Sequence, residues 1–174
     1  MLHLCYNGSM GTRKLEIIGN SALITINGIK KVPAKIDTGA ESSSVWASNI
    51  AMDADNRLSF CLFAPGSEFY TGERIVADDY KAMLVRNSTG QAKVRYRVHL
   101  SVKIGKKNIK AGFTLADRSK NNFPVLIGRR LLKDRFLVDV SQLEVPYPPR
   151  IQDMELNAEL EQNPQAFHQK HMSS

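Results

Sequence analysis

The stretch from Ala34 to Trp46 constrains the fold more than any other part of the chain, because an apolar strand in it ends on an acid. Asp37 closes the run Ile29–Ile36, and the small residues Thr38 and Gly39 follow at once. An acid directly after a buried strand lies in partly dry surroundings, which can shift its pKa and suit it to proton transfer. Asp and Gly are equally common in ordinary strand-ending turns, so the tripeptide alone leaves both interpretations open.

The residues around Asn27-Gly28 predict a β-hairpin whose second arm delivers Asp37. Apolar residues alternate from Ser21 to Ile26, and a second strand-like run extends from Ile29 to Ile36. Asn-Gly between two such runs is the strongest short hairpin signal, since both residues tolerate positive φ. Pro33 lacks an N–H donor, so it indicates a sheet edge or a bulge within this arm.

Further short runs separated by turn residues predict a mostly β domain with about one helix. The runs cover 58–63, 81–86, 91–96, 96–104, 108–116, 123–128 and 136–140, whereas 44–50 fits a helix or a strand. Val98, Leu100, Val102 and Ile104 alternate along one strand, and 129–134 predicts a short helix with Leu131 and Leu132 facing inward. The segments 24–37 and 102–115 share one plan, which suggests an internal duplication.

The length of 174 residues suffices for one domain with a real core, flanked by tails. We expect a flexible leader over 1–13, the folded domain over 14–142 and a polar C-terminal tail over 143–174. Residues 151–162 could form one helical turn or more, whereas Pro164 and the last residues predict disorder.

Composition limits the classes of partner. The chain contains two cysteines, too few for a disulfide framework, and no apolar run of the roughly 20 residues that a membrane span needs. We therefore expect a cytoplasmic protein without a membrane partner. The net charge of +7 fits a solvated surface, an acidic peptide substrate or a nucleic acid. Only Tyr96, between Arg95 and Arg97, resembles an aromatic flanked by cations, so a nucleic-acid partner is not favoured.

Two motifs in a fixed order carry a family resemblance. Ile36-Asp-Thr-Gly-Ala40 precedes the turn residues 87–90, and Leu126-Ile-Gly-Arg-Arg130 follows them. This order resembles a retropepsin, the single-lobe aspartic protease, over roughly residues 14–142. More closely, it is similar to a bacterial retropepsin-like family often labelled ATP-dependent zinc proteases. One branch of that family is implicated in trimming glutamate tails from a ribosomal protein.

The resemblance implies a single-lobe acid protease barrel with aspartic endopeptidase activity on a peptide or protein, with acidic peptides or glutamate tails as candidate substrates. It also implies roles for particular residues. Gly128 and Arg129 would support the active loop, with Arg129 forming an ion pair with Glu41. Catalysis would fall to Asp37, Thr38 and Gly39, and substrate binding to Ala40, Glu41 and a flap made of Asn87, Ser88, Thr89 and Gly90.

Neither zinc nor ATP is supported by the residues, despite the family label. The chain has no His-Glu-x-x-His, and its four histidines (His3, His99, His168, His171) show no ligand spacing. It also lacks the glycine-rich loop with Lys and Ser or Thr that holds ATP phosphates. We expect no metal and no cofactor.

An aspartic peptidase needs two carboxylates about 3 Å apart that share one proton, whereas this chain has one Asp-Thr-Gly. Asp139 lacks the Thr/Ser-Gly that follows such acids, and a strand-end acid is its simpler interpretation. The second Asp37 is therefore expected from a second copy, with 15–18 or 136–140 adding strands across the two-fold axis. The alternatives are a catalytically idle peptide-binding module that uses the same cleft, and a monomer with Asp139 as its second acid.

Overall fold

The computed structural model describes residues 14–86, 92–146 and 151–172, and strands are the main regular structure among them. The expected flap tip, residues 87–90, lies outside the described residues, as does the leader 1–13. The elements are β1 (Glu16–Ile18), β2 (Ser21–Ile26), β3 (Ile29–Asp37), β4 (Ser43–Met52), β5 (Leu58–Leu62), β6 (Arg74–Ala77), β7 (Tyr80–Arg86), β8 (Ala92–Ile104), β9 (Lys107–Ala116), β10 (Val125–Gly128), α1 (Arg129–Leu132), β11 (Phe136–Val138), α2 (Ile151–Gln162) and α3 (Pro164–Met172).

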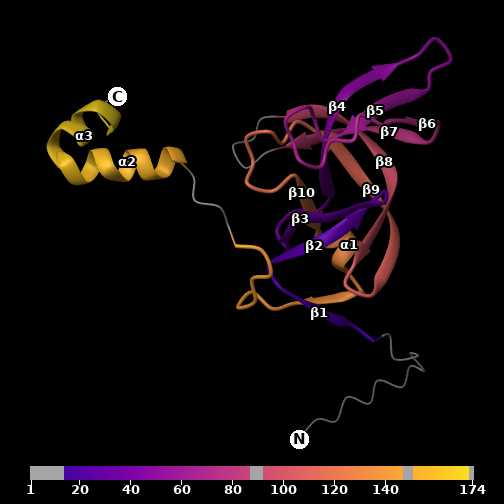
Figure 1. Cartoon of the computed structure of the whole chain (residues 1–174), viewed down its shortest axis with the longest axis horizontal. Coiled ribbons are helices and arrows are strands. Elements are labelled where there is room, and N and C mark those ends of the chain that lie inside the picture. Colours follow the sequence, from indigo (N-terminus) through magenta and orange to yellow (C-terminus); the bar gives the residue numbers. More distant parts are fainter. Residues whose placement is uncertain (1–13, 87–91, 147–150, 173–174) are drawn as a thin grey trace, which may run out of the picture.

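Six of these strands close into a barrel. The hydrogen-bonded order is β10–β3–β2–β8–β9–β4, and β4 returns to pair with β10, which completes the ring (Figure 1). β3 and β10 run parallel, as do β4 and β9, whereas the hairpins β2–β3 and β8–β9 are antiparallel. The predicted mostly β, single-lobe barrel with one short helix in its domain is confirmed.

The β2–β3 hairpin forms where Asn27-Gly28 predicts it. Asn27 and Gly28 have φ values of 45° and 86°, as a tight two-residue turn requires. The register shifts between Ile24 and Ile26, and Lys31 on the opposite arm has φ of 56°. The bulge indicated by Pro33 is therefore present two residues before it, and Pro33 itself lies just outside the pairing with β10, which begins at Ala34.

The alternating residues of β8 face the core as predicted. Val98, Leu100, Val102 and Ile104 are each at most 2% exposed. Segment 44–50, which fitted a helix or a strand, belongs to the ten-residue strand β4. Its alternation is irregular because β4 pairs with β10, β9 and β5 along its length.

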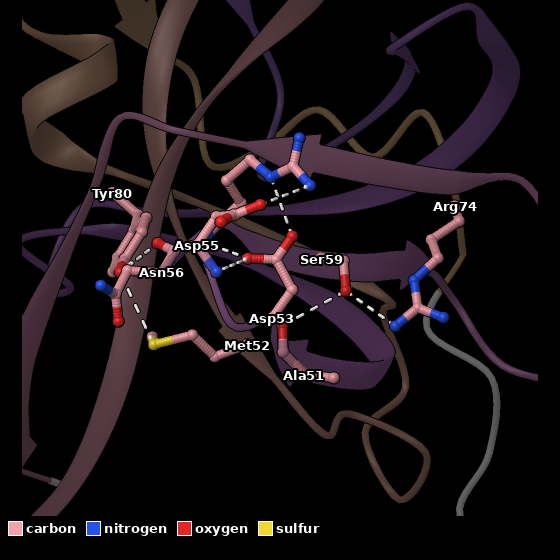
Figure 2. A network of polar contacts seen from close by, with 9 residues as sticks. Ala51, Met52, Asp53, Asp55, Asn56, Ser59, Arg74 and Tyr80 are labelled. Carbon is pink, nitrogen blue, oxygen red and sulfur yellow. Dashed lines mark hydrogen bonds and ion pairs between the residues drawn. The ribbon is translucent and has the colours of Figure 1, made fainter.

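Beyond the barrel, β4, β5 and β6 form an antiparallel extension held by polar contacts (Figure 2). Ser59 Oγ donates to the carbonyl of Ala51 and accepts from Nη2 of Arg74 at 2.8 Å, which joins β5 to both neighbours. The hydroxyl of Tyr80 donates to the carbonyl of Asn56 at 2.8 Å, so the start of β7 is tied to the β4–β5 turn. Within residues 60–80, β6 thus completes this extension.

The two ends of the domain pair with each other. β1 lies parallel to β11, with Ile17 opposite Leu137. Chain contacts continue past residue 142, because Ser21 Oγ donates to the carbonyl of Val145 at 2.8 Å and accepts from its N–H at 2.9 Å. The runs expected to add strands across a two-fold axis are therefore already partners of one another within one copy.

The expectation of disorder from Pro164 onward is wrong for residues 164–172, because they form α3 (Figure 1). Proline suits the first turn of a helix, and Asn163 caps it by accepting from the N–H of Ala166 at 3.1 Å. α3 packs on α2 through Glu159, which contacts Lys170 at 2.8 Å and His171 at 3.3 Å. No helix among the described residues is long and apolar enough to cross a membrane.

Candidate active site

Asp37 ends β3 at the point where β3 and β10 lie side by side. Gly128, the last residue of β10, is the register partner of Asp37. The chain leaves β3 through Thr38, Gly39 and Ala40, and it enters β4 at Ser43. The Asp-Thr-Gly motif and the later glycine therefore meet at one end of the barrel, although 91 residues (128 − 37) separate them in the sequence.

The carboxylate of Asp37 is held by its own loop. Oδ1 accepts from the backbone N–H groups of Gly39 and Ala40, each at 3.1 Å. Oδ2 lies 3.9 Å from the ammonium nitrogen of Lys35, and 27% of the Asp37 side chain is exposed. One oxygen is thus fixed by the backbone, and the carboxylate remains accessible to a ligand or a second protein chain.

Gly128 allows the Asp37 loop and the β10–α1 junction to approach closely. A Cβ at this position would lie 2.6 Å from the backbone carbon and oxygen of Ser42 and 2.9 Å from the carbonyl oxygen of Ala40. The N–H of Gly128 donates to Oγ of Ser43 at 3.1 Å in a buried contact. The backbone N–H of Arg129 donates to the carbonyl of Ala40 at 2.8 Å. Gly128 and Arg129 thus donate their backbone N–H groups to Ser43 and Ala40, and their support of a catalytic loop stays a prediction.

The predicted ion pair between Glu41 and Arg129 is wrong by one residue. Oε1 of Glu41 contacts Nη2 of Arg130 at 2.6 Å, with the two side chains 56% and 51% exposed. The N–H of Arg129 is engaged by Ala40, and that of Arg130 donates to the carbonyl of Glu41 at 3.2 Å. Helix residues turn by about 100° each, so this docking directs the second arginine toward Glu41.

Asp139 does not lie free as a second acid. Its Oδ1 accepts from the N–H and the hydroxyl of Ser141, and its Oδ2 accepts from the side-chain amide of Gln142 at 2.8 Å. Hydrogen bonds from the Ser141 side chain and backbone, then from Gln142, hold the pKa of Asp139 below its ordinary value. These contacts describe a turn-capping carboxylate, as its simpler interpretation supposes.

Arg118 is an additional cation near Asp37 that the motifs did not single out. It belongs to the loop between β9 and β10, and its Nε donates to the carbonyl of Phe123 at 3.0 Å. Burial lowers the pKa of Arg118, the neighbouring charge of Arg95 lowers it further, and the charge of Asp37 raises it. Arg118 therefore interacts electrostatically with Arg95 on β8 and with Asp37. No sequence motif singles out Arg118, because it approaches Arg95 and Asp37 only in the folded barrel.

The barrel, the Asp-Thr-Gly loop and the facing glycine together define a retropepsin-like protein. The family described as "RimB-like: Retropepsin-like aspartic endopeptidase RimB" matches residues 17–149, and the chain belongs to this family.

Similar proteins include longer chains that carry another name. Proteins named "Probable alpha-L-glutamate ligase" from Desulfotalea psychrophila and Parasynechococcus marenigrum are 29% and 27% identical over 64% and 79% of this chain. The matched regions make up 25% and 33% of those relatives, so the chain spans about a quarter to a third of their length.

A solved structure supports the fold alone. Protein Lpg0085 of Legionella pneumophila, described as of unknown function, superposes with a TM-score of 0.53 at 23% identity. The match covers 74% of this chain and 96% of that one.

Proposed function

We propose that this protein is an aspartic endopeptidase in which the Asp37 carboxylates of two copies act together. The observation that carries the proposal is the Asp37 loop, where two backbone N–H groups fix Oδ1 and leave the carboxylate partly exposed. In such a pair the ionised carboxylate takes a proton from water, and the protonated one gives a proton to the scissile carbonyl. Thr38 then steadies the paired loops, and Gly39 leaves room for the substrate backbone.

The surface beside the loop supports a second copy as the source of the second carboxylate. A groove of about 500 Å³ runs from Thr38 and Glu41 to β11. It includes Leu137, which is 54% exposed, and the paired Ile17 is 60% exposed. Apolar side chains at such exposure favour burial against another surface. A two-fold axis beside Thr38 would bring the same face of both copies together.

The charges around Asp37 favour acidic peptides as substrates. Lys35 lies 3.9 Å from Asp37, and the charge of Asp37 raises the pKa of Arg118, whose pKa burial and Arg95 lower. Cations at the mouth of a cleft raise the local concentration of anionic ligands and orient them. The relatives named alpha-L-glutamate ligase are consistent with a glutamate-rich chain as the target, because a peptidase in this family would remove what such a ligase adds.

Asp37→Asn tests the chemistry directly. Cleavage of a peptide with a polyglutamate tail should fall at least about 100-fold, since proton transfer by a carboxylate is lost. Asp139→Asn is the matched control, because it removes a carboxylate of the same type that caps a turn. Circular dichroism should show both variants folded. Equal cleavage by Asp37→Asn and the wild type would refute the peptidase proposal.

Mixing experiments test the need for two copies. Specific activity should fall on dilution, and excess Asp37→Asn should reduce wild-type activity because mixed pairs hold only one reactive acid. Excess Asp139→Asn should not do so. A monomer with concentration-independent activity would contradict the shared site.

The alternative of an idle peptide-binding module has a distinct outcome. Wild-type protein would then bind the polyglutamate peptide and leave it intact at every protein concentration, and Asp37→Asn would bind it with similar affinity.

A further inference from the structure

A small pocket beside α1 is lined by basic residues from β8, β9, α1 and the segment before β11. It has a volume of about 200 Å³ and lies between the β8–β9 hairpin, the start of β4 and α1. None of the described residues in its lining is acidic. The lining includes neither Asp37 nor Thr38 nor Gly39, so the pocket is separate from the candidate catalytic loop. Its basic residues are Arg97, His99, Lys110, Arg130 and Arg135.

Arg97 occupies an unusual position in the wall of this pocket. Its Nε is buried and has no hydrogen-bond partner in the described structure. A Cβ on Gly112 would collide with the Arg97 guanidinium, so glycine at 112 lets this group lie directly against β9. Buried polar groups in proteins nearly always have a partner, and an unpaired charged donor is costly. The guanidinium of Arg97 therefore keeps one N–H group without a partner among the described residues.

Carboxylates of this chain neutralise only part of the charge. Glu41 pairs with Arg130 at 2.6 Å, and Asp79 lies 3.3 Å from Nδ1 of His99. Arg97, Lys110 and Arg135 form no ion pair within the described residues. Arg135 is positioned by donating from Nη1 to the carbonyl groups at positions 131 and 133, each at 3.2 Å. Like charges held near one another repel, and an anion between them relieves that repulsion.

We propose that this pocket binds an oxyanion group, either a carboxylate or a phosphate. Arginine presents several donors in a planar fork that matches both groups, and lysine adds a point charge. Ser42 and Ser43 also line the pocket, and a serine hydroxyl can donate to an oxyanion. The volume lies below the usual range for drug-sized ligands, so it suits a small anion or one charged group of a larger molecule. The proposal does not depend on peptidase activity.

Titration of the full chain with inorganic phosphate and with citrate, at constant ionic strength, tests the site. Calorimetry should show saturable binding of at least one probe, and the Tm should rise with its concentration. Arg97→Gln should weaken binding at least tenfold. Lys110→Gln, a change at an exposed side chain, should weaken it as well and provides a second variant if Arg97→Gln does not fold. Lys103→Gln is the control, because it removes the same charge from β8 outside this pocket.

The pattern of probes identifies the anion. Binding of phosphate alone indicates a phosphate site, binding of citrate alone indicates a carboxylate site, and binding of both indicates general oxyanion recognition. Absence of saturable binding would overturn the proposal. So would an equal loss of affinity in Lys103→Gln and Lys110→Gln, since the effect would then be that of net charge alone.

Discussion

Replacing Gly128 with alanine should destabilise the protein by a steric effect that can be traced to three atoms. The added Cβ would lie 2.6 Å from the carbon and oxygen of Ser42 and 2.9 Å from the oxygen of Ala40. All three are backbone atoms, so no side-chain rotation relieves the contact. The φ of Gly128 is −89°, which alanine adopts readily, so backbone strain is not the cause. Overpacking in a tight interior typically costs 1–3 kcal/mol, and contact with backbone places this variant at about 3 kcal/mol.

For a chain of this size, that loss corresponds to a decrease in Tm of about 6–12 °C. Denaturant titration followed by circular dichroism measures the free energy directly. Gly39→Ala is the matched control for stability, because its Cβ would meet only Oδ1 of Asp37, at an ordinary 3.4 Å. If Gly128→Ala were as stable as Gly39→Ala, the close approach of the β10–α1 junction to the Asp37 loop would be refuted.

Two further predictions concern the ion pair of Glu41 and the turn at Asp139. A double-mutant cycle on Glu41 and Arg130 should give a coupling of no more than about 1 kcal/mol that salt weakens, because both side chains are about half exposed; a coupling of several kcal/mol would contradict this. The lowered pKa of Asp139 means that its contribution to stability is present above its unfolded-state pKa and is lost as the pH falls below about 4. Asp139→Asn should therefore make thermal unfolding less sensitive to acid than in the wild type, and an unchanged acid limb would count against the turn described for Ser141 and Gln142.

Local turn chemistry explains why much of the fold could be predicted. The β2–β3 hairpin depends on two neighbouring residues that accept positive φ, and both lie in the turn. The inward face of β8 follows from alternation, which a strand converts directly into burial. Closure of the barrel was expected only through the family resemblance, because the pairing of β10 with β3 and β4 joins segments about 80 to 90 residues apart in the chain.

The ion pair of Glu41 shows that motif spacing alone does not predict which arginine side chain contacts it. Spacing places an arginine after Gly128, but the direction of each side chain depends on how α1 leaves β10. The backbone contact from Arg129 to Ala40 sets that direction, and Arg130 then faces Glu41. A cap signal was also present and missed at the C-terminal end, where Asn163 precedes Pro164 in the pattern that begins α3.

Sequence spacing says even less about the charged residues near the Asp37 loop and in the basic pocket beside α1. Arg118, in the β9–β10 loop, interacts electrostatically with Asp37. The guanidinium of Arg97 on β8 lies against Gly112 on β9. Each contact joins residues whose types are unremarkable in isolation, since arginine on a strand or loop is usually solvated. Their meaning comes from burial and from the missing partner of the Arg97 Nε, which only the folded barrel creates. The Asp-Thr-Gly motif therefore locates Asp37 in the sequence, whereas the surroundings of Arg97 and Arg118 depend on how the barrel closes.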